Sequence, residues 1–303
     1  MILKDKTVII TGGTRGLGKE LCLEFAKNGC NVIFTYSRSQ TESKKVKLEI
    51  EKIGVTAKFF KLNLLNPDNI NEFCEIIKKE NINFDFLINN AASGVMKNSI
   101  ETTEKHWDWT MQVNVKGPWL LSKNLSKNIN KKGKIINISS PGSSKVLNNY
   151  FSIGVSKAAL ESLTRYMAYD LAKYDISVNS ISASLLETDA IKHFPNQEEI
   201  KSILGRKNPK QKKLIPNDVA KFAVSLCSEA GDMVIGQNIL IDGGDTLLLR
   251  YINKKSEEIF PTSFFLIKHN PTNSVLSLVI LKIFPDILSC DLNGAFIIIF
   301  SLD

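Results

Sequence analysis

The sequence predicts an α/β protein with a doubly wound parallel sheet of the Rossmann type. We expect a single domain, followed by a C-terminal tail that does not continue the pattern of the domain. Short apolar runs rich in β-branched residues alternate with longer helical patterns over residues 6–241. A glycine-rich turn separates the first apolar run from the first helical pattern, and the alternation ends at Gly243-Gly244. Strands that alternate with helices of this length form right-handed βαβ units, whose parallel sheet is covered on both faces.

The first half of the chain is expected to contain four strands and their connecting helices. Residues 6–11 form a β-branched run typical of a buried strand. The helix after the glycine-rich turn ends at Asn28-Gly29, and Gly54 stops the next helix. The other elements predicted in this half are strands at 31–36, 57–62 and 84–89, and helices at 43–53 and 67–79.

The second half continues the alternation. The predicted helices span residues 103–127, 154–173 and 217–228, and the predicted strands span residues 134–138, 177–181 and 237–241. A doubly wound sheet binds its ligand outside the carboxyl ends of its strands, so functional residues are expected in the loops that follow the strands.

We expect a Rossmann-type domain at residues 1–249 and an extension of unknown role at 250–303. The extension contains two apolar runs, at 275–281 and 295–300. Each is much shorter than the roughly 20 residues that a membrane helix needs, so we expect no membrane span. The runs could be strands, a partner-binding tail or a segment without an evolved role; we favour the last or a poorly ordered tail.

Composition excludes several classes of function. The chain is 43% hydrophobic and 23% charged, as in an ordinary globular protein. Its net charge of +8 suits an anionic ligand or an acidic partner, but no basic helix with interleaved aromatic residues indicates nucleic acid. The five cysteines form no CxxC pair and the three histidines are far apart, so no metal is expected. The absence of a secretory pattern at the start favours the cytoplasm.

The glycine-rich turn reads Thr-Gly-Gly-Thr-Arg-Gly-Leu-Gly over residues 11–18. Glycines at a strand–turn–helix junction let the backbone approach a pyrophosphate, and the helix N-terminus supplies N–H donors. A glycine pattern alone is weak, but this position strengthens it. The residues expected to contact a dinucleotide here are Gly12, Thr14, Arg15, Gly16, Leu17 and Gly18.

The end of the second strand favours NADP(H) over NAD(H). Sites for NAD usually place an acidic residue there to bind the ribose 2′-hydroxyl, whereas residues 34–38 read Phe-Thr-Tyr-Ser-Arg. Arg15 and Arg38 are therefore expected to bind the 2′-phosphate, although both could be ordinary exposed arginines.

Tyr150 and Lys157 are separated by six residues. Residues seven apart on a helix lie nearly on one face, so both side chains could reach one ligand. An ammonium group close to a phenol favours the phenolate. Lys157 is therefore expected to lower the pKa of Tyr150, which would act as a proton donor.

Several motifs, taken in order, resemble the short-chain dehydrogenase/reductase family over about residues 4–249. Besides the glycine-rich turn and the Tyr150–Lys157 pair, they are Asn89-Asn90-Ala91-Ala92, Asn114, Ser139-Ser140 and Asp242-Gly243-Gly244. The resemblance implies an oxidoreductase in which Ser140 and Asn114 assist Tyr150 and Lys157. The further cofactor contacts that it implies come from Asn63, Leu64, Asn90, Ala91, Thr188 and again Lys157, at the nicotinamide ribose.

The tyrosine spacing departs from the usual pattern of this family, in which the tyrosine precedes the lysine by four residues. Ile153 occupies that position and cannot donate a proton. The longer spacing resembles the enoyl-[acyl-carrier-protein] reductases of the family, most of all type III. This resemblance implies NADPH-dependent reduction of the 2,3-double bond of an enoyl thioester bound to acyl carrier protein, in fatty acid biosynthesis. Tyr150 would then stabilise or protonate the enolate oxygen, which lies away from the carbon that accepts hydride.

In this interpretation Lys157 binds the ribose hydroxyls, Ser140 contacts the substrate, and Asn114 forms a water or backbone bridge. Plain structural roles for Ser140 and Asn114 remain open.

The loop after the sixth strand has features of a substrate entrance. The flap candidates Leu185, Leu186, Ile191 and Phe194 could cover an acyl chain or only the core. The basic residues that follow are Lys192, Lys201, Arg206, Lys207, Lys210, Lys212 and Lys213. They could attract the acidic acyl carrier protein, although a charge run usually only faces solvent.

Two other functions remain open: a 3-oxoacyl or other carbonyl reductase that uses Tyr150, and a catalytically silent dinucleotide-binding protein. The family resemblance also implies a homotetramer, in which the predicted helices 103–127 and 154–173 pair between subunits.

Overall fold

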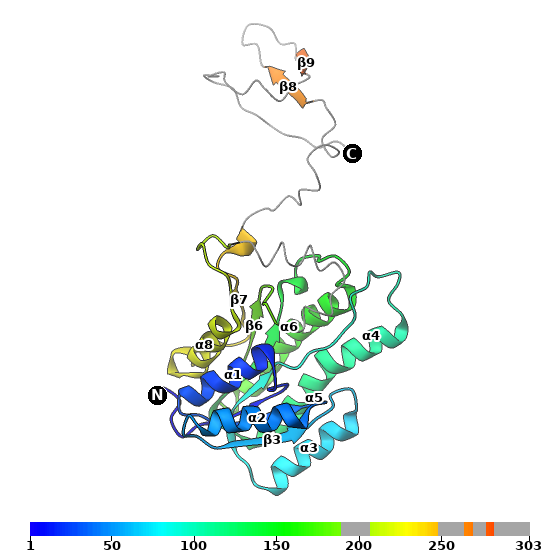
Figure 1. Cartoon of the computed structure of the whole chain (residues 1–303). Helices are drawn as coiled ribbons and strands as arrows, with labels where there is room; N and C mark the ends of the chain where they lie inside the picture. Colours follow the sequence, from blue (N-terminus) through cyan, green and yellow to red (C-terminus); the bar gives the residue numbers. More distant parts are fainter. Residues whose placement is uncertain (189–206, 248–263, 269–276, 282–303) are drawn as a thin grey trace. The chain divides into compact units, whose positions relative to one another are not determined.

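The computed structural model describes residues 1–188, 207–247, 264–268 and 277–281. The chain divides into two compact units, Met1–Leu247 and Leu248–Asp303. The first unit contains a parallel seven-stranded sheet with the strand order β3-β2-β1-β4-β5-β6-β7, and helices flank this sheet (Figure 1). The predicted doubly wound α/β fold is therefore confirmed.

The elements alternate along the chain as predicted. The strands of the first unit are β1 (Thr7–Ile10), β2 (Asn31–Tyr36), β3 (Ala57–Lys61), β4 (Phe84–Asn89), β5 (Ile129–Ser139), β6 (Ile176–Ala183) and β7 (Asn238–Ile241). The described α-helices are α1 (Gly16–Lys27), α2 (Gln40–Glu51), α3 (Pro67–Lys79), α4 (Glu104–Met111), α5 (Gly117–Leu125), α6 (Phe151–Ala172) and α8 (Pro216–Cys227). The shorter turns used below are the π-helical η1 (Gln112–Lys116) and the 3₁₀-helical η3 (Pro141–Ser143).

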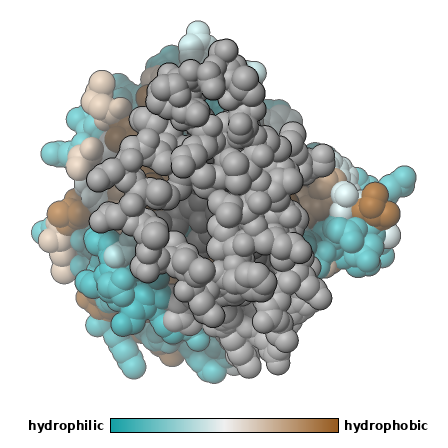
Figure 2. Space-filling view, turned by 90° about the horizontal axis from the view of Figure 1, so that it is seen from above, coloured by the Kyte–Doolittle hydropathy of each residue, from teal (hydrophilic) through white to brown (hydrophobic). Residues whose placement is uncertain are grey.

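Two hydrophobic clusters form the core, one on each face of the sheet. Alternate residues of β1 enter different clusters: Val8 and Ile10 join one, and Ile9 joins the other. Helices α1, α2 and α8 contribute to the first cluster, and α3, α5 and α6 contribute to the second. In the view of Figure 2 the described surface is mostly hydrophilic, with hydrophobic residues in small separate groups.

The single helix predicted at 103–127 is divided by a π-helical turn. Helix α4 leads into η1, which leads into α5. Pro118 has no N–H group to donate one turn back, and the buried side chain of Asn114 is bound by other segments. The spacing of apolar residues, from which the single helix was predicted, contains no information on the missing N–H group of Pro118 or on the hydrogen bonds of Asn114.

Helix α6 begins at Phe151, three residues earlier than predicted. Tyr150 is consequently the residue immediately before the helix, with φ −105° and ψ 17°. Its carbonyl oxygen accepts the Gly154 N–H at 2.7 Å, so the tyrosine is held against the first turn. The argument that Tyr150 and Lys157 lie on one helical face assumed a helix through both residues, whereas Tyr150 forms the N-cap of α6.

The second unit contains an antiparallel pair, β8 (Phe264–Lys268) and β9 (Ser277–Leu281). The first predicted apolar run thus contributes a strand, which was one of the open alternatives. The second run, at 295–300, lies outside the described residues.

Candidate active site

The glycine-rich turn lies between β1 and α1 and is tied to the end of β4. The Thr11 hydroxyl oxygen accepts hydrogen bonds from the N–H groups of Asn90 and Ala91, each at 3.0 Å. The Asn90 side-chain amide donates to the Thr11 carbonyl oxygen at 2.9 Å. These bonds place Asn90 and Ala91 beside the turn, at the carboxyl ends of two neighbouring strands.

The turn fits the pyrophosphate of a dinucleotide. Gly12 and Gly16 have φ angles of +70° and +52°, which favour glycine. A Cβ atom at Gly18 would overlap the Gly12 carbonyl oxygen, so only glycine allows α1 to begin this close to the turn. Helix α1 has no acidic residue in its first turn, and its positive N-terminal end would attract an anion.

The remaining predicted cofactor residues lie around this turn. Arg15 is the exposed N-cap residue of α1, and Arg38 is exposed two residues after β2. Asn63 follows β3, and its side-chain oxygen accepts the Leu65 N–H at 3.1 Å. The Leu64 side chain is packed in the second hydrophobic core cluster.

Two residues of the turn have different surroundings. Leu17 packs against the core cluster below α1, and Thr14 is half-buried. Thr188 comes from the loop after β6 and lies against Gly16, since a Cβ atom at Gly16 would be 3.3 Å from Thr188 Cβ. The structure thus brings the β6 loop next to the glycine-rich turn.

Tyr150 and Ser140 form the centre of the candidate catalytic site. The Tyr150 hydroxyl lies 3.3 Å from Ser140 Oγ, and either oxygen can donate the hydrogen bond. The tyrosine ring packs directly on Gly142: a Cβ atom there would lie 2.6 Å from Tyr150 Cε1. At Gly154 a Cβ atom would lie 2.7 Å from the Gly142 carbonyl oxygen. These two glycines therefore allow the ring to lie where it does.

Lys157 is buried on the first turns of α6 and points to the end of β5. Its Nζ donates a hydrogen bond of 2.7 Å to the Ile138 carbonyl oxygen. Burial lowers the pKa of Lys157 to about 8, and the negative charge of Glu161 opposes that shift.

The expected pKa shift of Tyr150 was wrong in direction. Burial raises the pKa of the Tyr150 phenol above its ordinary value, and the hydrogen bond with Ser140 only partly offsets this effect. The Lys157 ammonium group donates instead to the Ile138 carbonyl oxygen. The phenol is therefore held in its neutral form, which can donate a proton.

Asn114 is buried within the π-helical turn and is fully engaged with protein groups. Its side-chain oxygen accepts the Ser93 N–H at 2.8 Å. Its amide donates to the Ser93 carbonyl oxygen and to Ser156 Oγ, each at 2.9 Å. The side chain thus ties the loop after β4 to α6, in agreement with the structural alternative; a backbone role beside Lys157 stays a prediction.

Ile153 occupies the usual tyrosine position and is 9% exposed. A Cβ atom at Gly94 would lie only 2.5 Å from Ile153 Cγ1, so the two residues are in close contact. The loop after β4 therefore packs against the isoleucine side chain.

Sequence reasoning assigned no role in this site to four residues: Gly142, Gly154, Ser139 and Glu161, of which Ser139 was noted only as part of a motif. The two glycines flank Tyr150 in sequence, a signal that could have indicated close packing around the ring. The Ser139 hydroxyl donates to Glu161 Oε1 at 2.5 Å, a contact between distant segments that no local pattern reports.

The flap and the basic cluster are described only in part. Leu186 packs against the core, as in the core-covering alternative. A cavity beyond β6 is bordered by Leu185, Lys212 and Lys213. Lys207 and Lys210 are also exposed. The remaining residues of these two groups, Ile191, Lys192, Phe194, Lys201 and Arg206, lie outside the described residues.

No group of three or more metal-ligating side chains occurs in the described ranges. Within the same ranges, none of the helices has the length and apolar character needed to cross a membrane.

The sheet, the glycine-rich turn and the Ser140–Tyr150–Lys157 group define a dinucleotide-dependent oxidoreductase. A family model described as enoyl-(acyl carrier protein) reductase matches residues 12–246. The chain belongs to the short-chain dehydrogenase/reductase family, whose members bind NAD or NADP.

Individual relatives differ in their named substrates. The chain is 32% identical to a 3-oxoacyl-[acyl-carrier-protein] reductase of Aquifex aeolicus, over 80% of this chain and 98% of that protein. It is 26% identical to a 1-cyclohexenylcarbonyl-CoA reductase of Streptomyces collinus, over 78% of this chain and 85% of that protein. A short-chain dehydrogenase of Burkholderia cenocepacia, solved in complex with NADP, superposes with a TM-score of 0.75. It is 25% identical, covering 81% of this chain and all of the other.

Proposed function

We propose that this protein is an NADPH-dependent enoyl-[acyl-carrier-protein] reductase, which reduces the 2,3-double bond of enoyl thioesters in fatty acid biosynthesis. The observation that carries the proposal is the position of the proton donor. The Tyr150 hydroxyl adjoins Ser140, whereas the position four residues before Lys157 holds the buried Ile153. The description of the matching family model supports this choice, as does the unsaturated thioester named for the Streptomyces collinus relative.

NADP(H) is the proposed cofactor. Arg15 and Arg38 are exposed near the ends of β1 and β2, and no acidic residue follows β2 to bind a ribose 2′-hydroxyl. The bound NADP of the Burkholderia cenocepacia relative supports the same cofactor.

The nicotinamide ring would supply the hydride for the β-carbon of the enoyl thioester. Negative charge would then develop on the thioester oxygen, where Tyr150 donates a hydrogen bond or its proton. The saturated thioester forms when the α-carbon takes a proton from solvent and the oxygen, if protonated, returns its proton. Ser140 orients the Tyr150 hydroxyl from 3.3 Å. Lys157 holds the ribose hydroxyls with its ammonium group. The neutral phenol, maintained by burial, carries the proton that this step needs.

Acyl carrier protein is the proposed carrier of the substrate. Lys207, Lys210, Lys212 and Lys213 are exposed beyond β6, and a basic rim attracts an acidic partner. We further propose that residues 1–249 form the catalytic domain, that it assembles as a homotetramer, and that the protein acts in the cytoplasm.

The test is NADPH oxidation with crotonyl thioester and with acetoacetyl thioester, both bound to acyl carrier protein. We expect turnover of the crotonyl thioester and little of the acetoacetyl thioester. Tyr150→Phe, which keeps the ring on Gly142, should lower kcat by about 10²–10⁴-fold and leave NADPH affinity unchanged. Turnover of the keto substrate alone would exclude the proposal.

A carbonyl reductase is the second candidate, favoured by the 32% identity to the Aquifex aeolicus 3-oxoacyl reductase. The Ser140–Tyr150 pair could orient and protonate a ketone oxygen as well. The two substrates of the assay separate these candidates. Tight NADPH binding without turnover of either substrate would instead indicate a silent binding protein.

A further inference from the structure

Two successive residues at the end of β5 bind two residues of α6 that lie one helical turn apart. The Ile138 carbonyl oxygen accepts from Lys157 Nζ at 2.7 Å. The Ser139 hydroxyl donates to Glu161 Oε1 at 2.5 Å. Ser139 and Lys157 are only 4% and 6% exposed, so the Lys157 bond is buried, whereas Glu161 is half-buried and its bond with Ser139 is partly buried.

This arrangement separates two opposite charges that would otherwise meet. Residues four apart on a helix are neighbours, and a lysine and a glutamate in these positions commonly pair. Lys157 and Glu161 are not among the ion pairs formed within 4.0 Å in the described part of the chain, where the pairs on other helices include Lys47–Glu51. Each of the two side chains is instead bound to its own residue of β5.

We propose that Ser139 and Glu161 are positioning residues for Lys157: Glu161 keeps the buried ammonium group charged, and Ser139 keeps Glu161 from pairing with it. The ammonium group then remains available for the ribose hydroxyls of a dinucleotide. This inference rests on the cofactor-binding role proposed for Lys157, and it is independent of the choice between enoyl and keto substrates.

The charges around Lys157 agree with this role. Burial favours a neutral lysine, and the carboxylate of Glu161 counteracts it. The elements packed against α6 are β5, β6, η1, η3 and α4, and neither β6 nor η3 contains a charged residue. The ionisable groups on the other three are Glu104, Lys105, His106, Asp108, Lys116, Lys131, Lys132 and Lys134.

Lys134, the buried lysine among them, is paired with Asp232 at 2.7 Å. On α6 itself the other charged residues are Arg165 and Asp170, two and more helical turns beyond Lys157. Glu161, one turn from Lys157, is the charged group that opposes the effect of burial on the pKa of Lys157.

The test is an NMR titration of the lysine ¹³Cε signals of the full chain, with Lys157 assigned by Lys157→Arg. Glu161→Gln keeps an acceptor for Ser139 but removes the charge, and should lower the Lys157 midpoint by roughly one pH unit. Glu161→Asp retains the charge and should restore most of that shift. Ser139→Ala frees Glu161 to pair with Lys157 and should raise the midpoint.

NADPH binding, followed by fluorescence, gives a second readout. Glu161→Gln should weaken binding several-fold at pH 8 and little at pH 6, whereas Ser139→Ala should weaken it at both. Glu75→Gln, which breaks the exposed Glu75–Lys78 pair on α3, is the matched control and should change neither readout.

An unchanged Lys157 midpoint in Glu161→Gln would overturn the proposal. If Glu161→Gln does not fold, Ser139→Ala provides the test. A lowered or unchanged Lys157 midpoint in Ser139→Ala would also overturn the proposal. Turnover of crotonyl thioester by the unmodified protein is measured separately, so a failure of the proposed enoyl reduction is distinguishable from a failure of this pair.

Discussion

Tyr150 and Ile153 are three residues apart and lie in different surroundings. The Tyr150 hydroxyl meets Ser140, while the Ile153 side chain packs beside Gly94 in the wall of the loop after β4. A proton donor at residue 150 and a proton donor at residue 153 would thus reach different atoms of a bound substrate. In the proposed function, the position of the donor decides whether it meets an enolate oxygen or a ketone oxygen.

Moving the tyrosine to residue 153 should therefore not produce a carbonyl reductase. In the double variant Tyr150→Phe/Ile153→Tyr, the larger ring must displace the loop around Gly94. We expect a loss of about 1–3 kcal/mol in the free energy of unfolding, measured by urea denaturation. Crotonyl and acetoacetyl thioester reduction should both be low. Efficient acetoacetyl reduction at unchanged stability would contradict this account of the site.

At the scale of elements, the junction between β5 and α6 sets the geometry of the site. The end of β5 supplies the acceptor for Lys157, Ser140 follows β5 as the N-cap of η3, and η3 places Gly142 under the tyrosine ring. The first turn of α6 then packs on the Gly142 carbonyl oxygen, because Gly154 has no side chain. The end of β5, the 3₁₀ turn η3 and the start of α6 together act as one rigid support for the proton donor.

Gly142→Ala should disturb this support without disturbing the cofactor site. The added methyl group would lie 2.6–2.7 Å from two atoms of the Tyr150 ring, so the ring must move. We expect kcat to fall by about 10–100-fold, since misplacing a catalytic group by about 1 Å has effects of this size. The dissociation constant for NADPH should stay the same. Ser144→Ala, an exposed position in the same loop, is the control; equal kcat values for both variants would argue against the role of Gly142.

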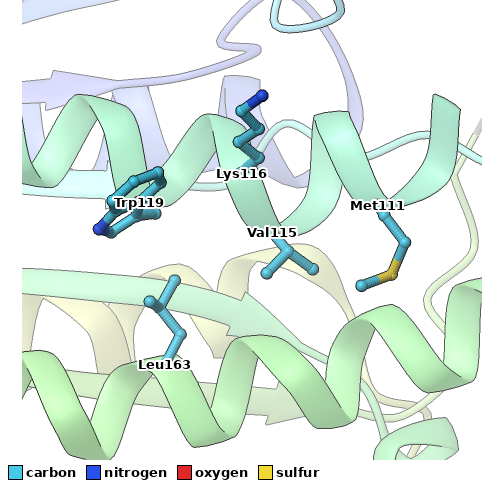
Figure 3. Close-up of a pocket in the computed structure, with 5 residues that line it drawn as sticks. All are labelled: Met111, Val115, Lys116, Trp119 and Leu163. Atoms are coloured by element: carbon cyan, nitrogen blue, oxygen red, sulfur yellow. The ribbon is translucent and has the colours of Figure 1, made fainter. Parts of the chain in front are cut away.

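At the scale of the whole molecule, an apolar groove between η1, α5 and α6 marks the surface that we propose for assembly. Figure 3 shows Val115 and Trp119 on one side of it and Leu163 of α6 on the other, while Lys116 points away. Trp119 is 38% exposed. Exposed aromatic and apolar residues around a groove are typical of a protein interface. This location agrees with the helix pairing that the family resemblance implies.

Trp119→Glu should place a charge in this interface. We expect the tetramer to dissociate into smaller species in sedimentation velocity, since a buried unpaired charge is costly. Leu48→Glu, on the exposed face of α2, tests whether any new surface charge has the same effect. If the original protein and the Trp119 variant sediment identically, the groove is not part of the interface between subunits.

Local patterns were sufficient to identify the order of strands and helices, the glycine-rich turn and the family. Helix α3 and strand β4 have the predicted bounds, because Pro67 and the period of apolar residues act over a few neighbours. Contacts between distant segments decided the rest. Burial reversed the expected pKa shift of Tyr150, Asn114 joined two segments inside a π-helical turn, and Ser139 bound Glu161. Desolvation and hydrogen bonding across the fold depend on which residues meet in space, and the spacing of residues along the chain does not contain that information.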